Sequence, residues 1–546
     1  MSPTAHILTP REVPDAAVPR LIEGAALADY AGYLTDESRR SGRAAALAFP
    51  TTLSEVSGAV RLALARGWDI TVSNARTGIA AGAVPEGGLL LSLERLSRVT
   101  GLRLDAAGNL VLRCQAGVAL SEVQKSLRRR SFQDSAAWSA ASGEALEALR
   151  QKTFFYPPDP TETGAAIGGT IACNASGAHT FLYGPTRPYV EALTVVLGDG
   201  RVLDLERGAC RATPEGRFGV RQPDGAVCWG TVPHYAWPRT KNAAGYYAAP
   251  EMDLIDLFIG SEGTLGIIVE AEIRALPAPE ARCAVMTFWP DEAAALRFTR
   301  AVRGRRHDLG LEAVEYVDPN AMALLRRRRA ALGAVSGVPE CLPAGAGSAI
   351  YLDVGTTSAR LEAVLEALCT AVAAHGGDPE VCWSAVAEDE RERLRVFRHA
   401  LPETVNAMIA EVRRQHPGVT KLGTDMAVPD EALEAVLALY RSRLDEARLP
   451  YVIFGHVGDN HLHVNILPQT PDDYDRGRRL YREFARAVVA MGGSPAAEHG
   501  IGRLKTDFLE VLYGADGVAQ MRAVKAVLDP GGRLGAGILF QGARPS

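Results

Sequence analysis

The chain has 546 residues, of which 47% are hydrophobic and 23% are charged, and its formal net charge is −5. This balance is typical of a globular enzyme, and the acidic net charge argues against a nucleic-acid-binding protein. Because the N-terminus lacks a basic and apolar leader and no apolar run approaches the roughly 20 residues of a membrane span, we expect a cytoplasmic protein of several domains with at most peripheral membrane contact.

The N-terminal region is predicted to contain both helices and strands. A capping box at 52–55 opens an amphipathic helix that ends near Gly67. The first strand after this helix leads into a loop of small residues at 73–78. An Ala/Ser-rich stretch at 131–149 is interpreted as an inserted helical excursion. Strands are expected at 69–72, 88–93 and 110–113.

Residues 156–177 contain a block that suits phosphate binding. After the motif PPDP, the segment IGGTIACNASG offers paired glycines and small side chains, which allow backbone N–H groups to approach phosphate oxygens. The block has neither the Lys-Ser/Thr of a P-loop nor the GxGxxG of a Rossmann fingerprint. Considered alone, it fits a tight structural turn equally well.

A strand predicted at 267–276 ends the N-terminal half of the chain. Its apolar residues alternate with charged residues such as Glu270 and Glu272, as expected of a half-exposed strand. Pro277 and Pro279 follow and mark a domain boundary.

Beyond this boundary, strands and helices alternate in a way that suits an antiparallel sheet covered by helices on one face. Two more helices are expected near 388–414 and 430–447, and another close to the C-terminus. The expected order before them is strand 283–289, helix from 291, strand 311–317, helix from 319, strand 348–354 and helix 358–375.

The segment 451–468, YVIFGHVGDNHLHVNILP, is predicted to form a β-hairpin. With residues 459–460 as a two-residue turn, His456 pairs with His463 on one face of the hairpin. Directly opposed residues have Cβ atoms about 5 Å apart, so the two imidazoles can bind one metal ion. His461 lies on the same face; it could replace either ligand, but we expect an exposed residue near the turn.

Glu498 and His499, in the segment AAEHGIG, add two more residues that can bind a metal. Two imidazoles and one carboxylate leave coordination positions open, as in sites where a metal acts on a substrate. The alternative is a satisfied polar pocket without a metal, which the histidine pair alone would favour. With Glu498 beside the pair, we favour a divalent metal, either zinc or manganese.

Together and in this order, the motifs resemble the FAD-dependent D-2-hydroxyacid dehydrogenases of the vanillyl-alcohol-oxidase type, which include D-lactate, glycolate and D-2-hydroxyglutarate dehydrogenases. The similarity spans about 33–539 and rests on PPDP, IGGTIACNASG, YG at 183–184, GSEGTLGI, GHVGDNHLHVN and EHGIG. It implies an α+β fold with a PCMH-type FAD-binding domain of two α+β subdomains at 1–276, an antiparallel-sheet, ferredoxin-like substrate (cap) domain at 277–505, and a C-terminal helical segment at 506–546 that returns to the FAD domain.

In that family, the first small-residue loop and the IGG…NASG block bind the pyrophosphate and ribityl parts of FAD, and GSEGTLGI lies along the dinucleotide. The first loop usually has consecutive glycines, whereas this chain has Asn74-Ala75-Arg76. Either these side chains point away from the phosphates or Arg76 adds a positive charge to them. The implied FAD contacts are Asn74, Ala75, Arg76, Thr77, Gly78, Pro158, Gly168, Gly169, Asn174, Gly177, Glu262, Gly263 and Ile267.

The resemblance also implies metal and substrate residues. For the substrate carboxylate the best match is Arg398 and the second is Lys421, and only an arginine binds a carboxylate through two parallel N–H groups. The family's hairpin turn usually reads Asp-Gly-Asn, whereas this chain has Asp459-Asn460-His461. The implied residues are His456, His463 and Glu498 for the metal, and Arg398, Lys421, Asn465 and His499 for the substrate.

We therefore expect an FAD-linked dehydrogenase that oxidises a D-2-hydroxy acid, with D-lactate as the first guess, to the 2-keto acid. His499 is expected to take the hydroxyl proton and Arg398 to orient the carboxylate. The electron acceptor is expected to be a quinone, a cytochrome or an electron-transfer flavoprotein. The oligomeric state is left open, with a homodimer as one possibility.

Two other kinds of protein stay open. One is a non-redox or phenol-oxidising flavoenzyme of the same fold, and the other is a flavin electron-transfer subunit of a complex. Alkylglycerone-phosphate synthases carry consecutive histidines, whereas here His461 and His463 are separated by a leucine, which favours the hydroxyacid group. An electron-transfer subunit would have little use for the histidines and Glu498 together.

Overall fold

The computed structural model describes residues 6–133 and 135–541. The outermost residues of the expected first and third domains, 1–5 and 542–546, lie outside the described residues, as does residue 134 in the expected helical excursion. Within the described ranges, every helix is too short or too polar to cross a lipid bilayer.

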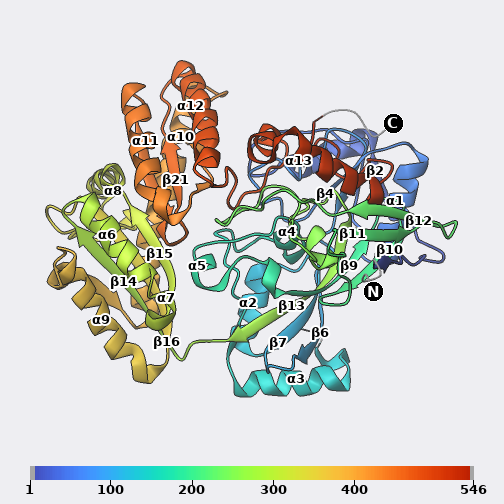
Figure 1. The fold of residues 1–546 in the computed structure, drawn as a ribbon, viewed down its shortest axis with the longest axis horizontal. Coiled ribbons are helices and arrows are strands. Elements are labelled where there is room, and N and C mark those ends of the chain that lie inside the picture. The colour runs from blue at the N-terminus through green and yellow to red at the C-terminus, as the bar shows by residue number, and fades with distance from the viewer. Residues whose placement is uncertain (1–5, 134, 542–546) are drawn as a thin grey trace.

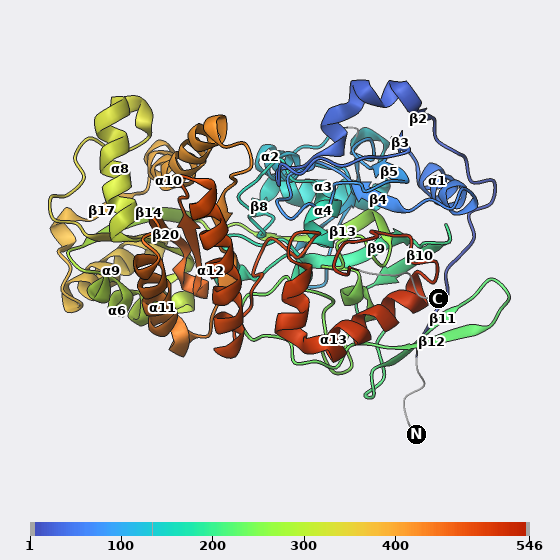
Figure 2. The same ribbon diagram turned by 90° about the horizontal axis from the view of Figure 1, so that it is seen from above.

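The chain folds into two lobes (Figure 1). The N-terminal lobe contains residues 6–277, and the cap lobe contains residues 281–490. Helix α13 (Thr506–Leu528), red in Figure 1, packs against the N-terminal lobe, as the view from above also shows (Figure 2). The chain therefore leaves the first lobe, builds the second and returns to the first.

A small sheet and helix α1 (Leu53–Ala65) begin the N-terminal lobe. The predicted capping box is confirmed, because Thr52 Oγ1 accepts the Glu55 N–H at 3.1 Å and the Glu55 carboxylate accepts the Thr51 N–H at 2.6 Å. Apolar residues of α1 pack in one core with the strands of this sheet. Its strand order is β2 (Leu21–Glu23), β3 (Ala46–Ala48), β5 (Leu89–Ser92) and β4 (Ile70–Ser73).

A six-stranded antiparallel sheet forms the centre of the N-terminal lobe. Its strand β13 (Ile267–Pro277) buries Ala271 and Ile273 and points Glu270 and Glu272 outward to arginines, which confirms the predicted alternation. The order is β10 (Val202–Glu206), β9 (Val190–Val196), β13, β7 (Leu110–Gln115) and β6 (Val99–Leu104), with β8 (Phe154–Phe155) on β13.

The predicted excursion contains helix α3 (Ala140–Gln151), which packs on β6. A second small sheet lies at the edge of the same lobe (Figure 2). The remaining elements are α2 (Leu120–Arg129), α4 (Ile167–Ala172), α5 (Thr180–Tyr183), β1 (Ile7–Leu8), β11 (Arg217–Arg221) and β12 (Val227–Thr231).

The cap lobe is built on an eight-stranded antiparallel sheet. The chain leaves β13 at Pro277 and enters the first strand of this sheet at Ala281. The order is β17 (Trp383–Ala385), β14 (Ala281–Trp289), β16 (Ser348–Thr356), β15 (Leu311–Val317), β20 (Tyr451–His456), β21 (His461–Ile466) and β18 (Leu422–Gly423), with β19 (Met426–Ala427) also on β21.

Helices pack on both faces of this sheet, so the expected one-sided cover is wrong. Cys283 and Val285 face a core with α6 and α9, whereas Ala284 and Met286 face α8 and α10. Strand β14 is apolar on both faces, and both faces must therefore be covered. The helices are α6 (Glu292–Arg303), α7 (Arg306–Leu309), α8 (Pro319–Leu332), α9 (Leu361–Ala374), α10 (Glu388–Gln415), α11 (Leu433–Glu446) and α12 (Pro471–Ala490).

The hairpin β20–β21 forms, but its register differs from the prediction. His456 pairs with His461 and Phe454 pairs with His463, so the expected pairing of His456 with His463 is wrong by two residues. The turn is a four-residue loop in which Asn460 adopts a φ of 50° and donates from Nδ2 to Asp430 at 2.7 Å. Because side chains alternate with a period of two, a slip of two residues keeps every side chain on its original face.

Candidate active site

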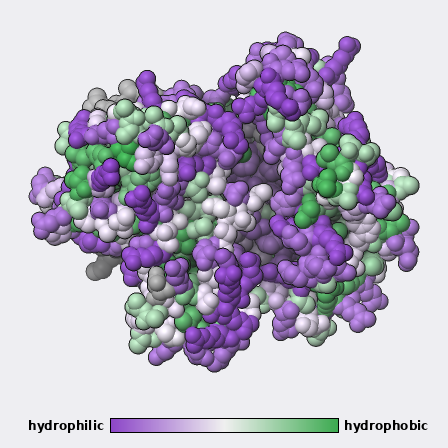
Figure 3. Space-filling view, turned by 180° about the vertical axis from the view of Figure 1, so that it is seen from behind, coloured by the Kyte–Doolittle hydropathy of each residue, from purple (hydrophilic) through white to green (hydrophobic). Residues whose placement is uncertain are grey.

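A cavity of about 1450 Å³ lies between the two lobes. From behind, the molecule is hollowed at this place, with hydrophilic and intermediate residues around the opening (Figure 3). Both lobes contribute to its wall. The predicted residues on the wall are Asn74, Ala75, Arg76, Thr77, Gly78, Gly168, Gly169, Glu262, Gly263, Ile267, Arg398, Lys421, His456, His463, Asn465, Glu498 and His499.

Pro158, Asn174 and Gly177 lie behind the wall instead. The Asn174 carboxamide accepts the backbone N–H of Arg187 at 2.9 Å. A Cβ atom on Gly177 would lie 2.0 Å from the carbonyl oxygen of Asp159, so only glycine allows these two backbone segments to approach. These residues shape the loop beneath the wall without reaching the cavity.

In the first loop, the Arg76 side chain contacts Tyr33, Glu94 and the backbone of Asn74. Its guanidinium lies 4.1 Å from the ring centroid of Tyr33, and Nη1 lies 3.5 Å from Glu94 Oε2. The same nitrogen donates to the carbonyl of Asn74 at 3.0 Å. These contacts engage the guanidinium with protein groups, and which of the two alternatives holds for this loop stays a prediction.

The two glycines of helix α4 have different surroundings. A Cβ on Gly168 would lie 2.6 Å from the Cβ of Ala116, at the end of β7, whereas a Cβ on Gly169 would have no atom within 4 Å. Gly168 therefore allows close packing of helix on sheet, and Gly169 leaves its side of the helix open to the cavity. An open, glycine-lined backbone is the kind of surface that a dinucleotide needs.

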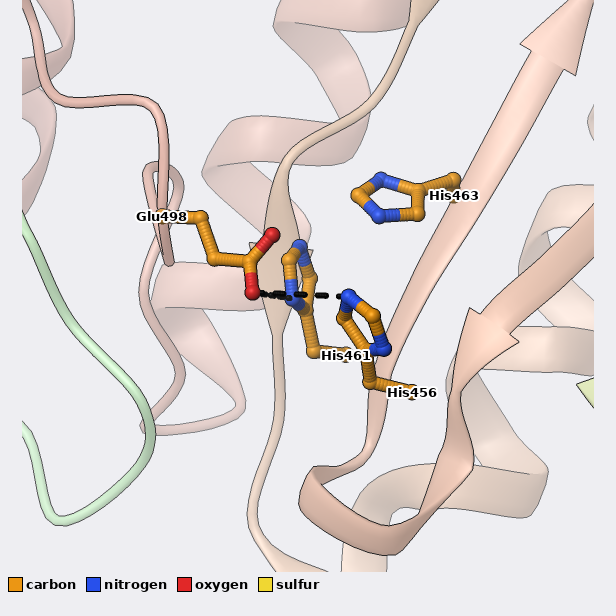
Figure 4. Close-up of side chains that lie close together, drawn as sticks. All are labelled: His456, His461, His463 and Glu498. Carbon is orange, nitrogen blue, oxygen red and sulfur yellow. Dashed lines mark ion pairs between the residues drawn. The ribbon is translucent and has the colours of Figure 1, made fainter. Parts of the chain in front are cut away.

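Three histidines and a glutamate converge beside this cavity (Figure 4). His456, His461, His463 and Glu498 each offer a ligand atom, and these four atoms lie within 4.8 Å of one another. The histidines come from the hairpin β20–β21, and Glu498 comes from the segment that connects α12 to α13. The predicted set of His456, His463 and Glu498 thus does converge.

Two of these rings are oriented by hydrogen bonds on the side away from the cluster. His456 Nδ1 donates to the Glu315 carboxylate at 2.5 Å, and His463 Nδ1 donates to the carbonyl of Thr424 at 2.9 Å. In each ring Nε2 is therefore left to face the cluster. This pattern of an outer acceptor behind a ligating imidazole is typical of metal sites.

His461 does not lie exposed near the turn, and that expectation is wrong. The residue is 0% exposed. Neither of its ring nitrogens has a hydrogen-bond partner among the described residues, although Nε2 lies 3.2 Å from Asp425 Oδ1. The register explains the difference, because a four-residue turn places His461 beside His456 inside the paired strands.

The Glu498 carboxylate is held by the N-terminal lobe. Lys241, in the loop after β12, forms an ion pair with it and donates to the carbonyl of Gly177 at 2.9 Å. Ser176 Oγ donates to the same Glu498 oxygen at 3.4 Å. Burial alone would raise the pKa of Glu498, but Lys241 and His456 hold this pKa well below its usual range, so Glu498 is a carboxylate.

Two carboxylates, the buried Asp425 of the cap lobe and the half-buried Glu262 of the N-terminal lobe, hold the loop that carries Glu498 and His499. Asp425 accepts the backbone N–H groups of Glu498 at 2.9 Å and His499 at 3.0 Å. Glu262 accepts those of Ile501 at 2.8 Å and Gly502 at 2.7 Å. The loop is therefore fixed in the crevice between the lobes.

The His499 ring stacks on His463, with centroids 5.8 Å apart, and Nδ1 lies 3.5 Å from Asp425. Burial lowers the pKa of His499, so its ring is neutral near neutral pH. A neutral imidazole at the cavity wall with a carboxylate behind it has the arrangement of a general base.

Polar groups that can bind an anion lie on the same wall. Arg398 Nε lies 3.4 Å from Glu315, which leaves the rest of the guanidinium on the cavity side. Asn465 Oδ1 is buried without a hydrogen-bond partner among the described residues. Lys421 forms no ion pair with any described residue.

Sequence reasoning missed Lys241, Glu315 and Asp425. Only Glu315 left a signal, because a charged residue inside the apolar run LEAVEYV of β15 needs a buried partner. Lys241 and Asp425 lie in irregular segments, where no periodicity distinguishes a buried charge from an exposed one.

The residues on the cavity wall fit both cofactors that the sequence implies, a divalent metal ion and FAD. For a divalent metal, the fit rests on the buried, unpartnered nitrogens of His461 and the free Nε2 atoms of His456 and His463 beside an ionised Glu498. For FAD, the fit rests on the volume of the cavity between the lobes, about 1450 Å³, and on the open backbone at Gly169.

The chain is similar to two families of protein domains. The family described as FAD linked oxidases, C-terminal domain, matches residues 278–539, and the FAD binding domain matches residues 44–142 and 136–206.

Among curated proteins, D-2-hydroxyglutarate dehydrogenase of Xanthomonas citri pv. viticola is 30% identical over 96% of this chain and 95% of its own length. D-lactate dehydrogenase of Anaerostipes hadrus is 27% identical over 88% and 86%. Glycolate oxidase subunit GlcD of Bacillus subtilis is 25% identical over 90% and 88%.

Solved structures of alkyldihydroxyacetonephosphate synthase in two crystal forms share the fold. They align with TM-scores of 0.58 and 0.62 and cover 98% of this chain and 88% and 87% of theirs. Their identities of 13% and 14% are too low to carry more than the fold.

Proposed function

The chain belongs to the FAD-linked oxidases, and on this premise we propose that it oxidises a D-2-hydroxy acid to the 2-keto acid. That it is an FAD-linked oxidoreductase, with the α+β fold expected from its sequence, follows from the family. The observation that carries the proposal is the His456, His463 and Glu498 cluster beside His499 and Arg398, on the wall of the cavity that the FAD-binding loops line.

Arg398 and Asn465 bind the substrate in this proposal. The Arg398 guanidinium pairs with the substrate carboxylate, since Arg398 lies on the cavity wall and 3.4 Å from Glu315, the carboxylate behind His456. The Asn465 carboxamide, whose Oδ1 has no partner among the described residues, supplies a second polar contact to the substrate. Two fixed contacts orient C2, and such orientation can supply several kcal/mol of the barrier reduction.

His499 accepts the hydroxyl proton, because its ring is neutral and Asp425 stabilises the imidazolium that forms. FAD, when bound along 74–78 and α4, supplies the acceptor for the hydride that leaves C2. A zinc or manganese ion, when held by His456, His463 and Glu498, lowers the pKa of the substrate hydroxyl.

D-lactate is the first substrate to test. D-2-hydroxyglutarate is a second candidate because Lys421, without an ion-pair partner among the described residues, can bind a second carboxylate. We further propose the division into residues 1–276, 277–505 and 506–546, and a quinone, cytochrome or electron-transfer flavoprotein as the electron acceptor.

The test is a screen of D- and L-2-hydroxy acids with an artificial electron acceptor, combined with anaerobic bleaching of the flavin absorbance. We expect D-acids to be oxidised and L-acids not. A chelator should abolish turnover, and added zinc or manganese should restore it.

If no hydroxy acid in the screen bleaches the flavin absorbance, a flavin electron-transfer subunit becomes the better proposal. Full activity after chelation, in protein without bound metal, would remove the metal from the proposal. Yellow colour that stays with the denatured chain would indicate covalent flavin and favour the phenol-oxidising alternative.

A further inference from the structure

We propose that His461 is a fourth protein ligand of the metal ion, so that the site contains three imidazoles and one carboxylate. This inference rests on the proposed metal site at His456, His463 and Glu498. It concerns His461, which the hairpin pairs with His456.

The position of His461 inside the cluster is the first argument. Its Nδ1 lies 3.9 Å from Glu498 Oε1, and its ring centroid lies 4.5 Å from that of His463 and 5.4 Å from that of His456. Figure 4 shows the ring between Glu498 and His456 rather than at the margin of the group. An ion that contacts the other three residues therefore lies within reach of His461.

The second argument is the missing hydrogen bonds. His461 is 0% exposed, and both ring nitrogens lack a hydrogen-bond partner among the described residues. Leaving a buried polar group unsatisfied costs about 1–3 kcal/mol, so native proteins rarely do this twice on one ring. A metal ion at Nδ1 removes this cost for the nitrogen that faces Glu498.

The other nitrogen already has a suitable outer acceptor. Nε2 lies 3.2 Å from Asp425 Oδ1, a carboxylate that is 1% exposed. Glu315 and the Thr424 carbonyl lie at the corresponding places behind His456 and His463, where they accept hydrogen bonds. All three imidazoles thus have an oxygen behind them and one nitrogen toward the cluster, as ligating histidines do, although His461 Nε2 makes no hydrogen bond to Asp425 in this structure.

A fourth ligand predicts metal preference. Imidazole nitrogen suits zinc, whereas a site richer in oxygen ligands suits manganese. Three imidazoles and one carboxylate therefore favour zinc over manganese more strongly than two imidazoles and one carboxylate would. His461→Asn should shift this preference back toward manganese.

The test measures metal binding rather than turnover. Protein with FAD bound is depleted of metal and titrated with zinc and with manganese in competition with a chromophoric chelator. We expect one zinc per wild-type chain, and in His461→Asn a zinc affinity at least about tenfold weaker, with a smaller ratio of zinc to manganese affinity. Cobalt(II) in the site should give a different visible spectrum in the variant.

His307→Asn, at an exposed position away from the cluster, is the matched control and should bind zinc like the wild type. His463→Asn is the positive control for the loss of a ligand. Wild-type zinc affinity and an unchanged cobalt spectrum in His461→Asn, together with weakened binding in His463→Asn, would overturn the role of His461 and leave the metal site intact. Absence of metal binding by the wild type would overturn the proposed site itself.

A measurement on the wild type avoids any folding defect of the variant. In a crystal structure of the zinc-loaded protein, His461 Nδ1 should lie about 2.0–2.1 Å from the ion. A separation above about 3 Å would overturn the proposal, because such a distance excludes a bond to zinc.

Discussion

At the scale of single residues, the roles in this site depend on what lies behind each side chain. His499 and His463 are neighbours with nearly parallel rings, 11° apart, yet one has a carboxylate behind it and the other a backbone carbonyl. Asp425 can stabilise a positive charge on His499, whereas the carbonyl of Thr424 only fixes which nitrogen of His463 carries hydrogen. We therefore propose proton transfer for His499 and metal binding for His463.

His499→Ala should lower turnover by roughly 10²–10⁴-fold, the usual contribution of a general base. The variant should still bind FAD and metal, because Glu498 and the hairpin histidines are unchanged. The measurement is steady-state turnover beside flavin and metal content. His399→Ala removes another histidine of the cavity wall and is the matched control. Retained turnover in His499→Ala would exclude His499 as the base.

At the scale of elements, local patterns predicted most helices and strands but not how they pair. Helix α1 begins at its capping residue as expected, and β13 alternates as expected. The hairpin register was wrong by two residues because a two-residue turn and a four-residue turn both suit the sequence Val457–Asn460. The four-residue turn is selected by contacts of Asn460 with Asp430 and Arg303, which lie far away in the sequence.

Helix α4 allows a test that separates packing from cofactor binding. Gly169→Leu should keep the fold and weaken FAD binding by at least about tenfold, or 1.4 kcal/mol, because its side chain enters open cavity space. Gly143→Leu, at an exposed position of α3 with no atom near its Cβ, is the control. The measurements are FAD affinity and the thermal midpoint of the FAD-free protein. Unchanged FAD affinity in Gly169→Leu would show that FAD lies elsewhere.

At the scale of the whole molecule, half-buried ion pairs join the two lobes. His179 Nδ1 lies 3.5 Å from Asp159 in the N-terminal lobe, and Nε2 lies 3.5 Å from Asp353 on β16 of the cap lobe. Tyr183 donates to Glu312 of the cap lobe at 2.7 Å. Burial by itself would lower the pKa of His179, but Asp159 and Asp353 raise it to about 9.

This pKa predicts a pH-dependent contact between the lobes. The folded-state pKa lies above the usual value of about 6.5, so the stabilisation is complete below about pH 6.5 and is lost as the pH rises through about 9. A shift of this size corresponds to roughly 3 kcal/mol. His179→Gln should therefore lose less thermal stability than the wild type between about pH 6 and about pH 10.

The measurement is the thermal midpoint as a function of pH, with His307→Gln as the control for loss of an exposed histidine. Groups that titrate elsewhere affect all three proteins alike, so the difference between the curves reports on His179. Parallel curves for His179→Gln and the wild type would contradict the role of this ion pair.

The sequence by itself determined the class of elements, their order and the cofactor family, because periodicity, turn chemistry and motifs are properties of short segments. It also supplied the candidate residues His456, His463, Glu498 and His499, whose roles stay predictions. Only the tertiary structure decided the hairpin register, the helices on both faces of the cap sheet and the burial of His461. The partners Lys241, Glu315 and Asp425 come from three separate parts of the chain. Local sequence patterns do not predict contacts between such distant residues, because these contacts depend on how complete elements pack against one another.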